Sequence, residues 1–173
     1  MLLRYPYALE VNTSALLLLA RAQKQQNKVE AIDNYAKWSI SSAQPSPQGL
    51  YEYAQILEDA GFNAKALEEY KVAMSALTND TGDLKRSTLR FHTARLLLRS
   101  DPENWEGIME LSNAVNEGFT DISAMEELLL DEQITPENRD EVRRLITTMQ
   151  KVAEEESSGE EAIEEESPEE DTW

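Results

Sequence analysis

The chain has 173 residues, with 34 acidic and 16 basic side chains and a formal net charge of -18 at pH 7. This acidity argues against nucleic-acid binding, because a nucleic-acid binder neutralises phosphates with lysine and arginine. The chain contains no cysteine, which excludes disulfides, thiolate metal sites and cysteine nucleophiles. Hydrophobic residues make up 40% of the chain, which is enough for one domain with a modest core.

Helix signals dominate the first half of the chain, and no alternating run of β-branched and aromatic residues predicts a strand. The first helix ends near Asn27, and the second stops before the linker 44–47, which contains two prolines. The third ends at the helix-terminating Gly61, and Asn63 can cap the fourth. The expected helices span residues 14–25, 29–41, 48–60 and 63–77.

The second half continues the same pattern after a polar loop at residues 78–82. Asp83 can cap the fifth helix, and Asp101 followed by Pro102 predicts the start of the sixth. Gly118 ends the sixth helix, and Pro136 begins the last one. The expected helices span residues 84–99, 102–117, 122–130 and 136–153.

The C-terminal segment from Glu154 to Trp173 holds eleven acidic residues and no basic one. It has too little apolar surface to bury, so packing cannot offset the entropy lost on ordering it. We therefore expect residues 154–173 to form a disordered acidic tail, either as a solubilising segment or as a regulatory one.

A spacing of small and large apolar residues repeats along the chain. The small residues Ala31, Ala66 and Gly107 lie 35 and 41 residues apart, and each is followed four positions later by a large apolar residue. The preceding helices carry alanines that lie 34 and 40 residues apart, namely Ala20, Ala54 and Ala94. A small residue lets two helix backbones approach closely, so the pattern predicts repeated helical hairpins that bury their apolar faces against their neighbours.

The repeat resembles the tetratricopeptide repeat. The match is best over residues 50–77, which carry Tyr53, Ala54, Leu57, Gly61, Ala66, Leu67, Tyr70 and Ala73. In the flanking units Trp38 replaces the usual small residue and Gly107 replaces alanine. The resemblance implies an all-α superhelix, or α-solenoid, with three repeat-like hairpins over residues 1–117. Residues 118–153 would then form capping helices of the same domain.

Candidates for catalysis are few. His92 is the only histidine, and the six glycines are scattered rather than gathered in a phosphate-binding loop. Adjacent carboxylates such as Glu68 and Glu69 do not face one another on a helix. We therefore expect a non-enzymatic protein that needs no cofactor and no metal.

In the family it resembles, the first helix of each unit lines a concave groove that holds a protein or peptide. Carried over to this chain, the expected binding residues are Arg21, Lys24, Tyr51, Gln55, Phe91, His92, Arg95 and Arg99. The helix 84–100 holds five basic residues and no acidic one. It could present an anion-binding wall to an acidic partner, or its arginines could pair with acids on neighbouring helices.

Three further expectations concern the acidic tail, a longer repeat array and the cell compartment. The acidic tail could contact Arg95 and Arg99 within the same molecule. The chain could instead be a structural piece or scaffold of a larger repeat array, because Tyr5 and Pro6 resemble the close of an earlier repeat and indicate a missing upstream portion. The apolar run 16–20 is too short for a membrane span or a signal core, and the absence of cysteine fits a reducing compartment, so we expect a cytoplasmic protein.

Overall fold

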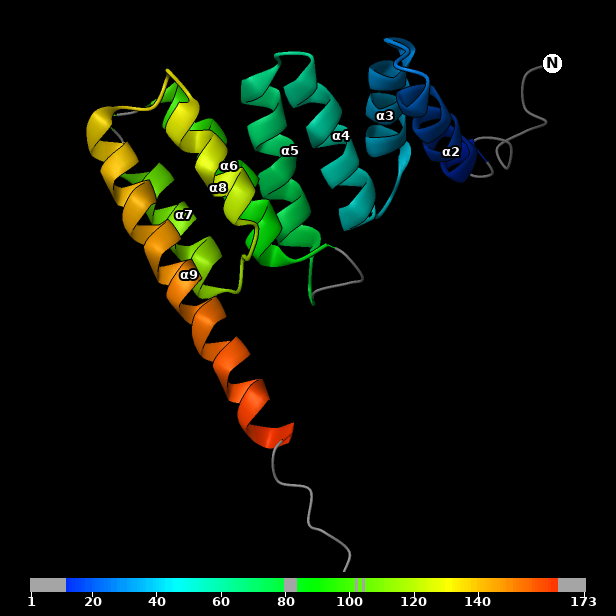
Figure 1. The fold of residues 1–173 in the computed structure, drawn as a ribbon. Helices are drawn as coiled ribbons and strands as arrows, with labels where there is room; N and C mark the ends of the chain where they lie inside the picture. Colours follow the sequence, from blue (N-terminus) through cyan, green and yellow to red (C-terminus); the bar gives the residue numbers. More distant parts are fainter. Residues whose placement is uncertain (1–11, 80–83, 102, 104, 165–173) are drawn as a thin grey trace, which may run out of the picture.

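The computed structural model of the chain describes residues 12–79, 84–101, 103 and 105–164 (Figure 1). These residues confirm the all-α prediction. They form eight α-helices, namely α2 (Asn12–Gln25), α3 (Glu30–Ser41), α4 (Pro47–Asp59), α5 (Asn63–Ala76), α6 (Arg86–Ser100), α7 (Glu106–Asn116), α8 (Ile122–Leu130) and α9 (Pro136–Glu164).

Three helices end in the same backbone motif. Asn27, Gly61 and Gly118 follow α2, α4 and α7, and each has a positive φ, of 52°, 80° and 86°. The next amide donates back to a carbonyl five residues earlier, in the bonds Lys28–Gln23, Phe62–Leu57 and Phe119–Ala114. This is the Schellman motif, which favours glycine or asparagine at the left-handed position. The predicted helix ends at these three residues are therefore confirmed.

The predicted helix starts are less accurate. Ser46 caps α4 by accepting from the Gly49 amide at 3.2 Å. Asn63, expected to be a cap, is instead the first residue of α5. Asp101 was expected to start the sixth helix, but its amide donates to the Leu97 carbonyl and ends α6. The next helix, α7, begins at Glu106. Asp83 lies outside the described residues.

The helices pack as successive hairpins, α2 with α3, α4 with α5, α6 with α7 and α8 with α9, in a row that Figure 1 shows from the blue end to the orange end. The hydrophobic core divides into two clusters. Leu89 and Leu96 of α6 belong to the cluster formed with α2, α3, α4 and α5. Phe91, Ala94 and Leu98 belong to the cluster formed with α7, α8 and α9. Therefore α6 joins the two halves of the molecule.

The small residues of the repeat are buried. Ala31 and Ala66 are fully buried, and Gly107 is buried against α6. A Cβ on Gly107 would lie 2.9 Å from Cγ of Leu98 and 3.1 Å from its backbone nitrogen. The spacing found in the sequence therefore marks buried positions, and at Gly107 it marks a close contact between α7 and α6.

The last helix differs from the prediction. We expected helix to end at residue 153, but α9 continues to Glu164, and its C-terminal part projects beyond the other helices (Figure 1). The segment from residue 154 to residue 164 has little apolar surface to bury. Glutamate and alanine nevertheless favour helix locally, without any packing partner, because their side chains lose little freedom there. Residues 165–173 lie outside the described residues. Among the helices that the structure does describe, none has both the length and the hydropathy needed to cross a membrane.

Replacing Gly107 with alanine should destabilise the protein by about 1–3 kcal/mol, because the added methyl group meets Leu98 of α6. Urea unfolding followed by circular dichroism would measure the change. Alanine is the better helix former by about 1 kcal/mol, so local propensity acts in the opposite direction. A Gly107→Ala variant that is as stable as the parent protein, or more so, would contradict the close approach.

Candidate functional site

Three hollows follow one another across the helices. The end hollow, of about 460 Å³, lies between the turns after α2 and α4 and includes Val29 and Phe62. The central hollow, of about 220 Å³, includes residues of α2, α4, α5 and α6. The α6 hollow, of about 330 Å³, lies between α4, α6 and the turn from α7 to α8.

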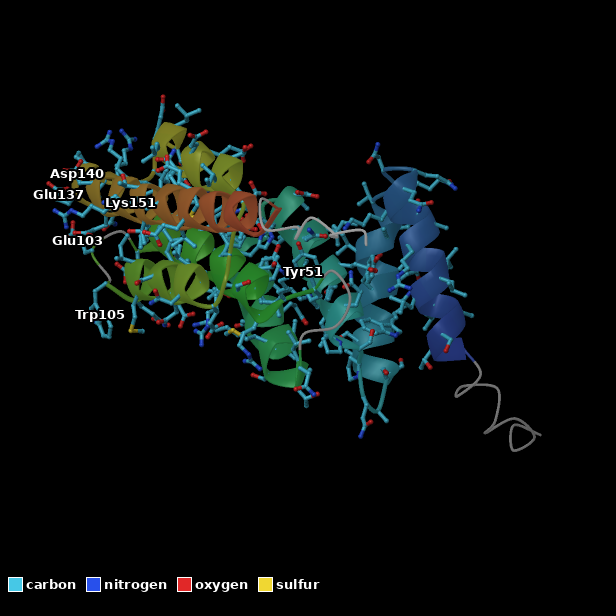
Figure 2. All side chains as sticks on the ribbon, turned by 60° about the horizontal axis from the view of Figure 1, so that its bottom comes forward. Tyr51, Glu103, Trp105, Glu137, Asp140 and Lys151 are labelled. Carbon is cyan, nitrogen blue, oxygen red and sulfur yellow. The ribbon has the colours of Figure 1, made fainter. Side chains whose placement is uncertain are left out.

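Neighbouring hollows share some of their lining residues. Lys24 and Asp59 line both the end hollow and the central hollow. His92 and Arg95 line both the central hollow and the α6 hollow. Tyr51, near the middle of the row of helices in Figure 2, lines the α6 hollow. The three hollows therefore lie side by side across the first three hairpins, and we call this row of hollows the groove.

Six of the eight predicted binding residues line this groove: Lys24, Tyr51, Gln55, Phe91, His92 and Arg95. Phe91 contributes a buried wall, only 3% exposed, rather than an exposed anchor. Arg21 lies outside the three hollows and binds both carboxylate oxygens of Glu52, at 2.7 and 3.1 Å. Arg99 lines a separate depression beside Asp131.

Glu58 of α4 is the centre of the polar contacts in the groove. Its carboxylate accepts from Tyr70 at 3.0 Å and pairs with Arg95 at 2.7 Å and with Arg99 at 3.5 Å. The side chain is only 9% exposed. Burial alone would raise the pKa of the Glu58 carboxyl, but the ion pair with Arg95 and the hydrogen bond from Tyr70 outweigh it, and the pKa falls to about 2. Glu58 is therefore a buried, permanent anion at neutral pH.

His92 of α6 lies between Glu58 and the α6 hollow. A guanidinium can only donate, so the 3.0 Å contact from Arg95 makes Nδ1 of His92 the acceptor. Nε2 then carries the proton and donates to the Tyr51 hydroxyl oxygen at 3.2 Å. The ring also stacks on Tyr70, with 5.0 Å between centroids. Burial lowers the pKa of His92, despite the opposing effect of Glu58, which agrees with a neutral ring.

The arginines of α6 are engaged inside the protein. Arg86 donates to carbonyls at the end of α5, and Arg90 pairs with two glutamates of the third hairpin. Arg95 pairs with Glu58 of α4, and Arg99 pairs with Asp131, which follows α8. Of the two interpretations of this basic helix, the geometry matches the one in which arginines pair with acids on neighbouring elements. An acidic partner would have to compete with these contacts.

The acidic tail, which was predicted to contact Arg95 and Arg99, would also have to displace the carboxylates that these arginines already bind. These side chains already hold Glu58 and Asp131. The helical part of the tail continues along α9 and projects past the other helices (Figure 1). Residues 165–173, which carry the rest of the expected tail, lie outside the described residues.

Sequence reasoning missed several residues of the groove. Tyr70 lies on the second helix of its hairpin, whereas the prediction considered only first helices. Phe119 follows Gly118 in the Schellman motif, a position that often makes an apolar contact, and it stacks on Phe91 with 4.4 Å between centroids. The Gly118 signal could therefore have identified Phe119 as a wall residue.

The described part of the chain holds no group of three or more histidine, aspartate or glutamate residues that could bind a metal ion. Comparisons with protein-family models, with curated proteins and with solved structures found no match to the chain. The resemblance to tetratricopeptide repeats therefore rests on the residues of this chain alone, and so does any functional proposal.

Replacing Glu58 with glutamine should destabilise the protein at pH 7 by about 3 kcal/mol, because Arg95 would keep a half-buried charge without its carboxylate. Urea unfolding at a series of pH values would measure the effect. Glu68→Gln is the matched control, since Glu68 is exposed on α5, and we expect a change within about 0.5 kcal/mol.

Urea unfolding at a series of pH values also tests how the stability contributed by Glu58 depends on pH. The pKa of Glu58 is lower in the folded protein than its ordinary value of 4.5, so the unfolded chain binds more protons in this range. The stabilisation is present above pH 4.5 and disappears as the pH falls toward about 2. Glu58→Gln should remove that part of the acid sensitivity. A profile with the same slope as the parent protein would contradict the assignment.

Proposed function

We propose that this protein binds an extended segment of another protein in the groove formed by the three hollows, without catalysing a reaction. The observation that carries the proposal is the sharing of wall residues by neighbouring hollows, Lys24 and Asp59 at one junction and His92 and Arg95 at the other. Neighbouring hollows across three hairpins suit an extended chain, which can place successive side chains in successive hollows.

The end hollow supports this function with exposed apolar side chains. Val29 is 79% exposed and Phe62 is 56% exposed, and both line the same hollow. Single exposed apolar residues are common on protein surfaces, but two large ones beside one apolar hollow are typical of an interaction site. We expect the bound segment to place a large apolar side chain here.

The central hollow has balanced charges. Its walls include the cations Lys24 and Arg95 and the anions Glu58 and Asp59. Lys24 also donates to the Gln55 side chain at 3.0 Å. This balance favours a polar, uncharged stretch of the partner at the middle of the groove, because a net charge there would meet as much repulsion as attraction.

Peptide selection with the full-length chain would test this function. A library of random short peptides is displayed on phage and selected against the immobilised protein, and the enriched peptides are synthesised and titrated. We expect Phe62→Glu to weaken them roughly tenfold or more, because the end hollow loses its apolar wall and gains a charge.

Val72→Glu provides the matched control. Val72 is 49% exposed on α5, similar to Phe62, but it lines none of the three hollows. We expect peptide affinity to be unchanged in this variant. The proposal is overturned if no peptide is enriched, or if both variants bind the enriched peptides as well as the parent protein does.

A structural role in a larger assembly is the second candidate, and the outer side of α2 favours it. Leu18 is 64% exposed and Leu19 is 48% exposed, on the first helix of the row. A second copy of this chain could cover these leucines. Sedimentation at increasing concentration should then show a dimer that Leu18→Glu abolishes and Ile40→Glu, on the 86% exposed Ile40 of α3, preserves. A monomer at all concentrations would eliminate this arrangement.

A further inference from the structure

The α6 hollow lies at the first turn of α6. The residue before the helix is Lys85, which makes no side-chain capping bond, and the first turn contains no acidic residue. The N-terminus of a helix carries a partial positive charge and favours anions. Lys85 and the first-turn residues Ser87 and Thr88 all line the hollow.

Two buried donors on the wall of this hollow have no acceptor. Ser87 is 1% exposed, and its hydroxyl makes no hydrogen bond. Nε of Arg95, on the same wall, is also buried without a partner, although the rest of that guanidinium binds Glu58 and His92. A buried polar atom without a partner is unfavourable and rare in native proteins. The Ser87 hydroxyl and the Arg95 Nε–H group could both donate to an acceptor oxygen.

The charges around the α6 hollow agree with an anionic ligand. Lys85 contributes a cation, and Arg95 on the same wall is paired with Glu58. The one acidic residue on the described walls, Asp121, already accepts from the Ala124 amide at 2.9 Å and so caps α8. Lys85 is exposed and forms no ion pair with any residue that the structure describes. Lys85 is therefore the cation at this hollow that an anionic ligand can reach.

The other walls are aromatic. Phe91 and Phe119 stack at 4.4 Å with their planes 10° apart, and Tyr51 faces the same space. A volume of about 330 Å³ exceeds what a bare inorganic ion needs. Apolar walls beside hydrogen-bond donors fit a side chain that has an apolar stem and a charged end.

We propose that the α6 hollow binds the carboxylate of an aspartate or glutamate side chain in the partner segment, with the apolar part of that segment against Phe91 and Phe119. The inference rests on the proposed function and specifies one of its contacts. The acid is bound by the first turn of α6 and Lys85, while Arg95 and Arg99 keep their internal carboxylates.

A small carboxylate can test the site without a known partner. The full-length, ¹⁵N-labelled chain is titrated with 3-phenylpropionate and, separately, with the uncharged 3-phenylpropionamide. We expect the carboxylate to shift the amide signals of Ser87, Thr88 and Thr120 at millimolar concentration. The amide should bind roughly tenfold more weakly, because it lacks the charge that the helix N-terminus and Lys85 attract.

Two matched pairs of variants locate the contact. Ser87→Ala removes the unpartnered hydroxyl, and Thr93→Val does the same at another buried α6 position that lines none of the three hollows. Both hydroxyls lack partners, so neither variant should unfold the protein. Lys85→Ala is compared with Lys37→Ala, on the exposed surface of α3. Binding of 3-phenylpropionate should fall severalfold in Ser87→Ala and Lys85→Ala and should stay unchanged in the two controls.

The outcomes separate this inference from the proposed function. Equal binding of the carboxylate and its amide, or no shift at Ser87 and Thr88, overturns the carboxylate site even if selected peptides still bind the groove. Inorganic phosphate that shifts the same amides more strongly than 3-phenylpropionate overturns the side-chain assignment in favour of a free anion site. A carboxylate that binds here while no peptide is enriched overturns the proposed function instead.

Discussion

The arrangement of the whole molecule depends on α6 being buried on two sides. Leu89 and Leu96 pack toward the N-terminal hairpins, while Phe91, Ala94 and Leu98 pack toward the C-terminal ones. A helix with two apolar faces leaves only narrow edges for charged side chains, so its arginines are half-buried there. A half-buried guanidinium needs an acceptor, because its desolvation is otherwise uncompensated. The ion pairs of α6 are therefore a consequence of its central position.

This constraint also shapes the groove. Arg95 reaches Glu58 on α4, and the same carboxylate orders Tyr70 and lies beside His92. Those side chains are the walls of the central hollow and of its junction with the α6 hollow. The residues that hold the second and third hairpins together are thus the residues that line the groove between them. A partner that displaced Glu58 from Arg95 would weaken the hairpin contact, so binding by contacts that leave this pair intact is favoured.

The sequence predicted the helices well because their ends are encoded locally. Asn27, Gly61 and Gly118 end helices through a motif that needs only a few neighbouring residues. The partners of the α6 arginines could not be predicted in the same way. Asp131 is 32 residues from Arg99, and the chain has 34 acidic residues from which to choose. The α6 hollow could not be predicted either, because its walls come from three separate parts of the chain, namely α4, α6 and the turn after α7. The helix α9 extends beyond residue 153 because glutamate and alanine favour helix locally, a contribution that is independent of burial.

The net charge of the protein limits the kind of acidic segment that the groove can accept. With a formal charge of -18 and the α6 arginines neutralised internally, the surrounding field repels an approaching polyanion. A single carboxylate gains from the first turn of α6 and Lys85 at short range, where screening by salt matters least. Each additional acid in the partner would meet the negative body without a further donor. A segment with one acid beside the α6 hollow, a neutral middle and an apolar residue for the end hollow therefore fits this groove better than a run of glutamates such as the one that begins at Glu154.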